Sequence, residues 1–313
     1  MQRSLQAKDR YAKLLFDSGL RKEHLVCPLF VSERKQKTVS AMPGMNVTPA
    51  TRVVEQVSSI RQAGLSSIII FGIPKDRNKN GSEAYDRNGV VQRAVREIKG
   101  SFGKSINLIT DVCLCQYNLT GHCGLLVNGS VDNDKSIELL AKIAASHAEA
   151  GSDVVAPSAM MDGQVRAIRH ALGKDAKILS YSAKHSSSLY APFRSAAFAK
   201  QGVINKSSYQ VSFSNPRQAL REIESDIKEG ADIVMVKPGL AYLDLIRAAK
   251  DNFSVPLAVQ NVSGEYTMIK AAGKRGWIDE EQWKVLSIAS MKRAGADLII
   301  SYFALDVAGY LAE

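Results

Sequence analysis

Two lysines stand where a charged side chain is unexpected, at the ends of short apolar runs. Lys184 follows the run KILSYS, and Lys237 ends the run IVMVK. Burial of an ammonium group is costly, while desolvation and a neighbouring cation lower the pKa of an amine and make it nucleophilic. One such lysine could equally be salt-bridged or reach solvent with its head group. Two of them favour Schiff-base chemistry on ketones or aldehydes.

Three cysteines form a C-x-C-x7-C pattern at Cys113, Cys115 and Cys123, with His122 beside the last. Three thiolates that leave a fourth position to water or substrate are typical of a catalytic zinc site rather than a closed structural one. The spacing is moderately specific, and buried free thiols are the alternative. Cys27 lies inside an apolar run, so we interpret it as a core residue.

Other polar residues follow the same kind of run and could complete a site. Asp111 precedes the cysteines and is a candidate for proton transfer. Side chains that could hold a substrate carboxylate are Ser158, Gln210, Ser263 and Tyr302 by hydrogen bonds and Arg194 by a bidentate contact.

Eight apolar or β-branched runs, each followed by a turn and a segment of helical period, would position these residues. Such strands, with little polar alternation, indicate a parallel sheet covered by helices, and eight units predict a closed (β/α)8 TIM barrel. Barrel enzymes build their sites at the carboxyl ends of the strands, so the candidate residues would converge there. The runs begin at Leu25, Ser66, Ile106, Val154, Lys177, Ile233, Pro256 and Leu298.

The helical segments carry start and stop signals. In the segment 215–230, Asn215 can cap, Pro216 suits the first turn and Gly230 ends the helix. Further helices are expected in the ranges 137–151, 50–63, 90–98, 240–250 and 279–294, and long loops after the third and fifth strands. We assign residues 1–23 to a short N-terminal arm and 24–313 to a single barrel domain.

Composition limits the classes of function. The chain has 313 residues, 45% hydrophobic and 23% charged, which suits a globular domain, and four cysteines are too few for a disulfide framework. Its net charge of +10 is spread over separate clusters without aromatic interleaving, so we expect no nucleic-acid partner. We expect no membrane partner either, because no signal peptide and no apolar stretch of about 18 residues is evident, and we predict a cytoplasmic location.

Ten strings in order along nearly the whole chain identify it as similar to the porphobilinogen synthase (aminolaevulinate dehydratase) family. They are MPG, FGIP, DVCLCQYN, GHCG, APSAMMDG, SYSAK, PFR, EGADIVMVKPG, SGEY and KRAGADLIISY. The resemblance implies a β/α barrel with an N-terminal arm, assembled as a homo-oligomer, usually an octamer. It also implies a lyase that condenses two 5-aminolaevulinate molecules to porphobilinogen in haem biosynthesis.

The same resemblance implies separate residue roles. Lys237 matches the lysine that forms the Schiff base with the first substrate, and Lys184 matches the one that binds the second. The three cysteines match the ligands of the catalytic zinc of the zinc-type members, which polarises the second substrate or activates a water. Ser263 and Tyr302 match the first carboxylate pocket. The remaining matches are Arg194, Lys206 and Gln210 for the second carboxylate pocket and Glu222 for an allosteric magnesium.

Several positions depart from the family pattern near the predicted mouth of the barrel. Ala159 and Gln164 replace an aspartate and an arginine, which suggests that a charge pair was lost together. Gln260, in the run VQNVSGEY, stands in place of a tyrosine, and Lys206 keeps the charge of an arginine without its bidentate geometry. The other departures are Ala191 for glycine and Thr120 for histidine.

Three functions therefore remain open from the sequence. The leading hypothesis is a zinc-dependent porphobilinogen synthase. A divergent paralogue could use the same imine chemistry on another amino-ketone or give another product. A metal-binding barrel without catalysis is disfavoured, because a scaffold has no need of two desolvated amines.

Overall fold

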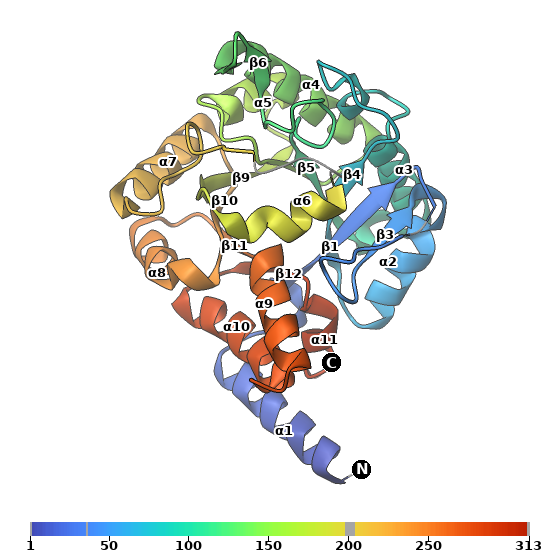
Figure 1. The fold of residues 1–313 in the computed structure, drawn as a ribbon, viewed down its shortest axis with the longest axis vertical. Coiled ribbons are helices and arrows are strands. Elements are labelled where there is room, and N and C mark those ends of the chain that lie inside the picture. Colours follow the sequence, from blue (N-terminus) through green and yellow to red (C-terminus); the bar gives the residue numbers. More distant parts are fainter. Residues whose placement is uncertain (1, 36, 198–203, 312–313) are drawn as a thin grey trace.

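Eight parallel strands form a closed barrel at the centre of the molecule (Figure 1). The structure is a computed structural model that describes residues 2–35, 37–197 and 204–311. Pairing of β1 with β12 closes the ring, with Leu25 opposite Ile299. Around the ring the strands are β1 Leu25–Ser32, β4 Ser67–Ile73, β5 Asn107–Val112, β8 Val154–Pro157, β9 Lys177–Lys184, β10 Ile233–Lys237, β11 Leu257–Asn261 and β12 Leu298–Ser301.

All eight predicted runs are strands of this barrel, so the predicted fold class is confirmed. The strands are almost wholly buried, as in β1, where all eight residues are buried, because the interior and the helical layer each cover one face. In a parallel barrel all carboxyl ends meet at one mouth, which is where the candidate residues lie.

A ring of helices surrounds the strands. The expected helix after Asn215 is present, and Asn215 Oδ1 accepts a hydrogen bond from the backbone N–H of Gln218 at 3.1 Å. Gly230 ends this helix with a φ of 105°. The ring consists of α2 Val53–Gln62, α3 Val90–Phe102, α4 Asn133–Ala150, α5 Gln164–Leu172, α7 Pro216–Glu229, α8 Leu243–Asn252, α10 Glu280–Ala294 and α11 Ala304–Ala308.

The two long connections contain elements that we did not predict. The one after β5 carries a hairpin of β6 Leu125–Val127 and β7 Ser130–Asp132, and the one after β9 carries α6 Ala191–Ala197. Helix α9 Ser263–Lys274 follows β11 and contacts α6. A second added pair, β2 Lys37–Thr38 and β3 Asn46–Pro49, extends the sheet beyond β1. These segments lie around the mouth and enclose it.

The N-terminal segment forms a helix, α1 Gln2–Asp17, that leads away from the ring (Figure 1). It contacts α10, and Tyr11 donates a hydrogen bond to Asp279 at 3.3 Å. Among the described residues no helix is long and apolar enough to cross a membrane. The cytoplasmic location and the boundary between arm and barrel at residue 23 stay predictions.

Candidate active site

The two candidate lysines are direct neighbours across the sheet. Lys184 ends β9, Lys237 ends β10, and the two residues are paired in register. Neighbouring strands are about 4.8 Å apart, so the two amines enter the mouth side by side. Both residues are about 8% exposed. This pairing brings together the two reactive groups that the sequence singled out.

Lys237 lies in an aromatic enclosure. Its Nζ is 4.9 Å from the ring centre of Tyr181, 5.3 Å from that of Tyr190 and 6.0 Å from that of Phe193. Burial, and secondly the positive charge of Lys184, lower the pKa of Lys237 to about 7. About half of Lys237 is then neutral at pH 7, whereas an ordinary lysine is roughly 0.04% neutral. Lys237 is thus prepared for nucleophilic attack.

Lys184 and Asp111 share the next part of the site. Lys184 Nζ donates a hydrogen bond to the backbone oxygen of Ser158 at 2.6 Å. Asp111 Oδ2 accepts one from Gln116 Nε2 at 2.9 Å. Burial raises the pKa of Asp111, although hydrogen bonding to Ser158 and the charge of Lys184 oppose this. A carboxyl group that holds its proton more readily, close to both amines, suits proton transfer.

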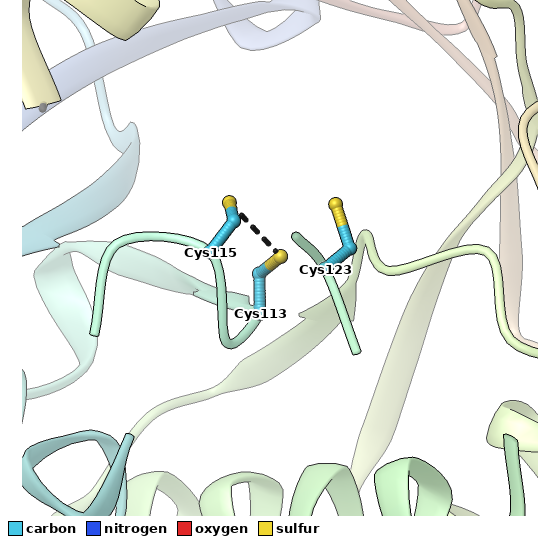
Figure 2. Close-up of side chains that lie close together, drawn as sticks. All are labelled: Cys113, Cys115 and Cys123. Atoms are coloured by element: carbon cyan, nitrogen blue, oxygen red, sulfur yellow. Dashed lines mark hydrogen bonds between the residues drawn. The ribbon is translucent and has the colours of Figure 1, made fainter. Parts of the chain in front are cut away.

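The three cysteines form one buried cluster. Cys113 and Cys115 follow β5, and Cys123 lies on a neighbouring segment of the same long connection (Figure 2). Their sulfur atoms all lie within 4.8 Å of one another, and those of Cys113 and Cys115 are 3.2 Å apart. Hydrogen bonds, first from Cys113 and then from Cys115, hold the pKa of the Cys123 thiol well below its usual range. A thiolate flanked by two thiols is suited to a metal ion.

Lys206 contacts this cluster. Its Nζ donates a hydrogen bond to Cys123 Sγ at 3.2 Å, and the residue is about 5% exposed. Although burial acts in the opposite direction, the cysteine sulfurs, Cys123 foremost, raise the pKa of Lys206 above its ordinary value. Lys206 also lines the cavity over the lysine pair, so its charge is available both to the sulfur and to a substrate.

A cavity over the two lysines collects most of the predicted binding residues. Ser263, at the start of α9, accepts a hydrogen bond from the backbone N–H of Phe193 and donates one to the backbone oxygen of Leu189, both at 3.1 Å. Arg194 comes from α6, and Tyr302 follows β12. The described residues that line the cavity are Cys115, Lys184, Tyr190, Phe193, Arg194, Lys206, Gln210, Lys237, Gln260, Val262, Ser263 and Tyr302.

Two predicted residues lie elsewhere. Ser158 is not among the residues that line this cavity, and it instead contacts Lys184 and Asp111. Glu222, on α7, lines a separate cleft of about 980 Å³ together with Asp162 and Asp226. Burial raises the pKa of Glu222, and secondly the charge of Asp162 does so.

The sequence reasoning missed the aromatic enclosure of Lys237. Tyr181 and Tyr190 had no individual signal, because aromatic residues in apolar segments are ordinarily core residues. Phe193 is in the string PFR, which contributed to the family resemblance but received no role. Gln116, next to the cysteines, was also overlooked as a partner of Asp111.

The positions that depart from the family pattern are spread more widely than we expected. Lys206 and Gln260 line the lysine cavity. Ala159 is fully buried, and Gln164 lines the acidic cleft instead. Thr120 donates a hydrogen bond to Asn118 at 3.1 Å beside the cysteine segment. Only two of these substitutions therefore change the surface that meets a substrate in the lysine cavity.

Two adjacent buried amines lie at the mouth of the β/α barrel, with a thiol cluster beside them. This arrangement defines the protein as a β/α-barrel enzyme. The family model of delta-aminolevulinic acid dehydratase matches residues 1–310. The chain therefore belongs to the delta-aminolevulinic acid dehydratase family, and it is a lyase of the dehydratase type.

Individual relatives agree with this assignment. The delta-aminolevulinic acid dehydratase of Archaeoglobus fulgidus is 48% identical over 93% of this chain and 92% of its own. That of Bacillus subtilis is 43% identical over 99% and 98%. A crystal structure of the Toxoplasma gondii enzyme, also called porphobilinogen synthase, in complex with its reaction product porphobilinogen superposes with a TM-score of 0.90. It is 37% identical and covers 92% of this chain and 85% of its own.

The pKa of Lys237 leads to a prediction on pH. Imine formation needs the neutral amine, so borohydride trapping of a keto acid at Lys237 should increase as the pH rises through about 7. Lys184→Met removes the neighbouring positive charge, so the midpoint should move to higher pH. Peptide mass mapping of reduced protein from pH 5.5 to 9 measures the midpoint. Lys228→Met, an exposed lysine on α7, is the control, and equal midpoints in the two variants would contradict the argument.

Proposed function

We propose that this protein is a porphobilinogen synthase, which condenses two molecules of 5-aminolaevulinate to porphobilinogen in tetrapyrrole biosynthesis. The observation that carries the proposal is the in-register pair of Lys184 and Lys237 at the mouth of the barrel. Two amines on adjacent strands can each hold one ketone, which places two substrate molecules close enough to react. Family membership over residues 1–310 supports the same reaction.

Lys237 begins the proposed reaction. Its neutral amine attacks the ketone carbon of the first molecule, water leaves and a C=N bond forms. Asp111, which lies close to both amines, exchanges the protons that this step requires. Ser263 and Tyr302 hold the first carboxylate by hydrogen bonds, as the resemblance implies. The aromatic rings around Lys237 exclude water and so favour the imine.

Lys184 holds the second molecule. Its side chain already points to the backbone oxygen of Ser158, a contact that fixes the position of the amine. Arg194, Lys206 and Gln210 line the cavity, and we assign their cationic and amide groups to the second carboxylate, as the resemblance implies. The two molecules are thus oriented by opposite sides of one cavity for carbon–carbon and carbon–nitrogen bond formation.

Zinc is the metal that we propose for the three cysteines. Three sulfur ligands in one buried cluster, one of them with a strongly lowered pKa, fit a soft divalent ion with a position left for substrate. Bound there, zinc would supply Lewis-acid polarisation of the second substrate.

For the acidic cleft we propose Mg²⁺, with Glu222 as a ligand, because hard carboxylate oxygens suit that ion.

The reaction has a direct test. Zinc-loaded protein incubated with 5-aminolaevulinate should give a pyrrole that reacts with an acidic aldehyde reagent, and Lys237→Met should lose at least about a thousandfold in rate because it removes the nucleophile. No pyrrole from the wild type would reject the proposed function. Borohydride trapping of another amino-ketone at Lys237 would then favour the divergent paralogue. No trapping with any carbonyl compound would favour a barrel that only binds metal.

Two variants test the proposed zinc site and the proposed magnesium site independently. Cys113→Ala should lose bound zinc, since it removes one of three protein ligands. Glu222→Gln should keep its zinc and lose any increase in rate that added Mg²⁺ gives to the wild type. Elemental analysis after gel filtration measures the first effect and steady-state assays the second. Unchanged zinc in Cys113→Ala would refute the assigned site.

We also propose that the protein is a homo-oligomer assembled through the N-terminal helix. Helix α1 buries Tyr11 and Leu15 but leaves Phe16 about 81% and Leu14 about 45% exposed. Trp277, beyond α9, is about 73% exposed. Large exposed apolar side chains near one end of the molecule are typical of an interface between subunits. The resemblance favours a second copy of this chain as the partner, in an octamer or a smaller assembly.

Analytical ultracentrifugation can test this assembly. Phe16→Asp should shift the protein towards smaller species, because a charge placed in a subunit interface must be desolvated. Phe213→Asp changes an equally exposed residue, about 77%, in the loop before α7 and serves as the matched control. A monomeric wild type, or an unchanged assembly in Phe16→Asp, would contradict the proposal.

A further inference from the structure

Gln260 is a buried side chain with an unused hydrogen-bond acceptor. It is about 1% exposed, lies near the end of β11 and lines the cavity over the lysine pair. Its Oε1 has no hydrogen-bond partner among the described residues. A buried carbonyl oxygen without a donor is unfavourable, so the position suggests a donor that arrives with the substrate.

The strand register places Gln260 beside Lys237. Val236 of β10 is paired with Val259 of β11, and Lys237 and Gln260 are the next residues on each strand. The two backbones are therefore about 4.8 Å apart. Gln210 has the other unpartnered amide oxygen in the cavity, but it belongs to the Lys184 side, because the backbone N–H of Val211 donates to the backbone oxygen of Lys184 at 3.1 Å.

The charges of the side chains that line the cavity indicate what kind of hydrogen-bond donor Gln260 would bind. Among the described lining residues there are four cationic side chains and no carboxylate: Lys184, Arg194, Lys206 and Lys237. This set attracts the carboxylate of a keto acid but repels a substrate ammonium group. Ser263 and Tyr302 are assigned to the carboxylate of this substrate, and Tyr190 OH donates a hydrogen bond to the backbone oxygen of His185. Among the described residues that line the cavity, Gln260 therefore offers an unpartnered neutral acceptor beside Lys237.

We propose that Gln260 is a specificity-determining residue whose Oε1 accepts a hydrogen bond from the protonated amino group of the substrate held as an imine by Lys237. The inference rests on the proposed function and deepens it, since it assigns a residue of this chain to the recognition of the amino group of the first substrate molecule. Gln260 departs from the family pattern, so the role belongs to this chain.

Two ligands that differ only in the amino group test the inference. Zinc-loaded protein is mixed with 5-aminolaevulinate or with laevulinate, reduced with borohydride within the first turnover, and the mass added at Lys237 is mapped against ligand concentration. Gln260→Leu removes the acceptor at similar volume and loses no hydrogen bond of Oε1, so it should fold. We expect its half-saturating concentration for 5-aminolaevulinate to rise about tenfold, because a hydrogen bond to a charged donor is lost, while that for laevulinate stays within about twofold.

Gln260→Glu supplies the matched rescue. A carboxylate keeps the acceptor and adds a charge opposite the ammonium group, so the preference for the amino ketone should be retained or increased. Equal changes for both ligands in Gln260→Leu, or no change for either, would overturn the role of Gln260 and leave the proposed function intact. Absence of trapping with both ligands in the wild type would instead reject the proposed function.

Discussion

Burial of two ammonium-bearing side chains at neighbouring strand ends is the constraint on which the site depends. Lys184 and Lys237 are paired in register and nearly inaccessible to water. Two like charges so close together, away from solvent, favour a state in which one amine is neutral, and Lys237 has its pKa lowered to about 7. The barrel supplies the rigidity that keeps them together, because each lysine extends a strand that is hydrogen-bonded on both sides.

The surroundings of the lysine pair divide the cavity into two halves. On the Lys237 side, aromatic rings make an enclosure of low polarity, and one unpartnered amide oxygen lies beside it. On the Lys184 side lie Lys206 and the thiol cluster, where charge is concentrated. An enclosure of low polarity favours a neutral nucleophile, while a metal and cations favour polarisation of a carbonyl group. One cavity can therefore treat two identical substrate molecules differently.

The residues that depart from the family pattern lie in different parts of the structure, so their expected effects on the site differ. Ala159 is fully buried and Gln164 lines the acidic cleft, and neither residue lines the lysine cavity. Lys206 and Gln260 do face the substrate cavity. A change of substrate preference would have to act through these two side chains, and the site is otherwise equipped for the reaction of the family.

The barrel, the lysine pair and the cysteine cluster could all be predicted from the pattern of residues along the chain. Apolar runs of strand length with helices between them permit little else, and a lysine at the end of such a run conflicts with the hydrophobic pattern strongly enough to be noticed. The cysteines were recognisable because their spacing is local.

The side chains that surround the reactive groups could not be predicted in this way, because they come together only in the folded chain. The register that places Gln260 beside Lys237, the aromatic ring of Phe193 brought in by α6, and the contact of Lys206 with Cys123 all join segments far apart in the chain. Such contacts depend on strand register and on how the connections pack over the mouth, and no local pattern of residues encodes them. An unpartnered buried oxygen is likewise a property of three-dimensional packing, because a glutamine in an apolar strand looks the same whether or not a partner reaches it.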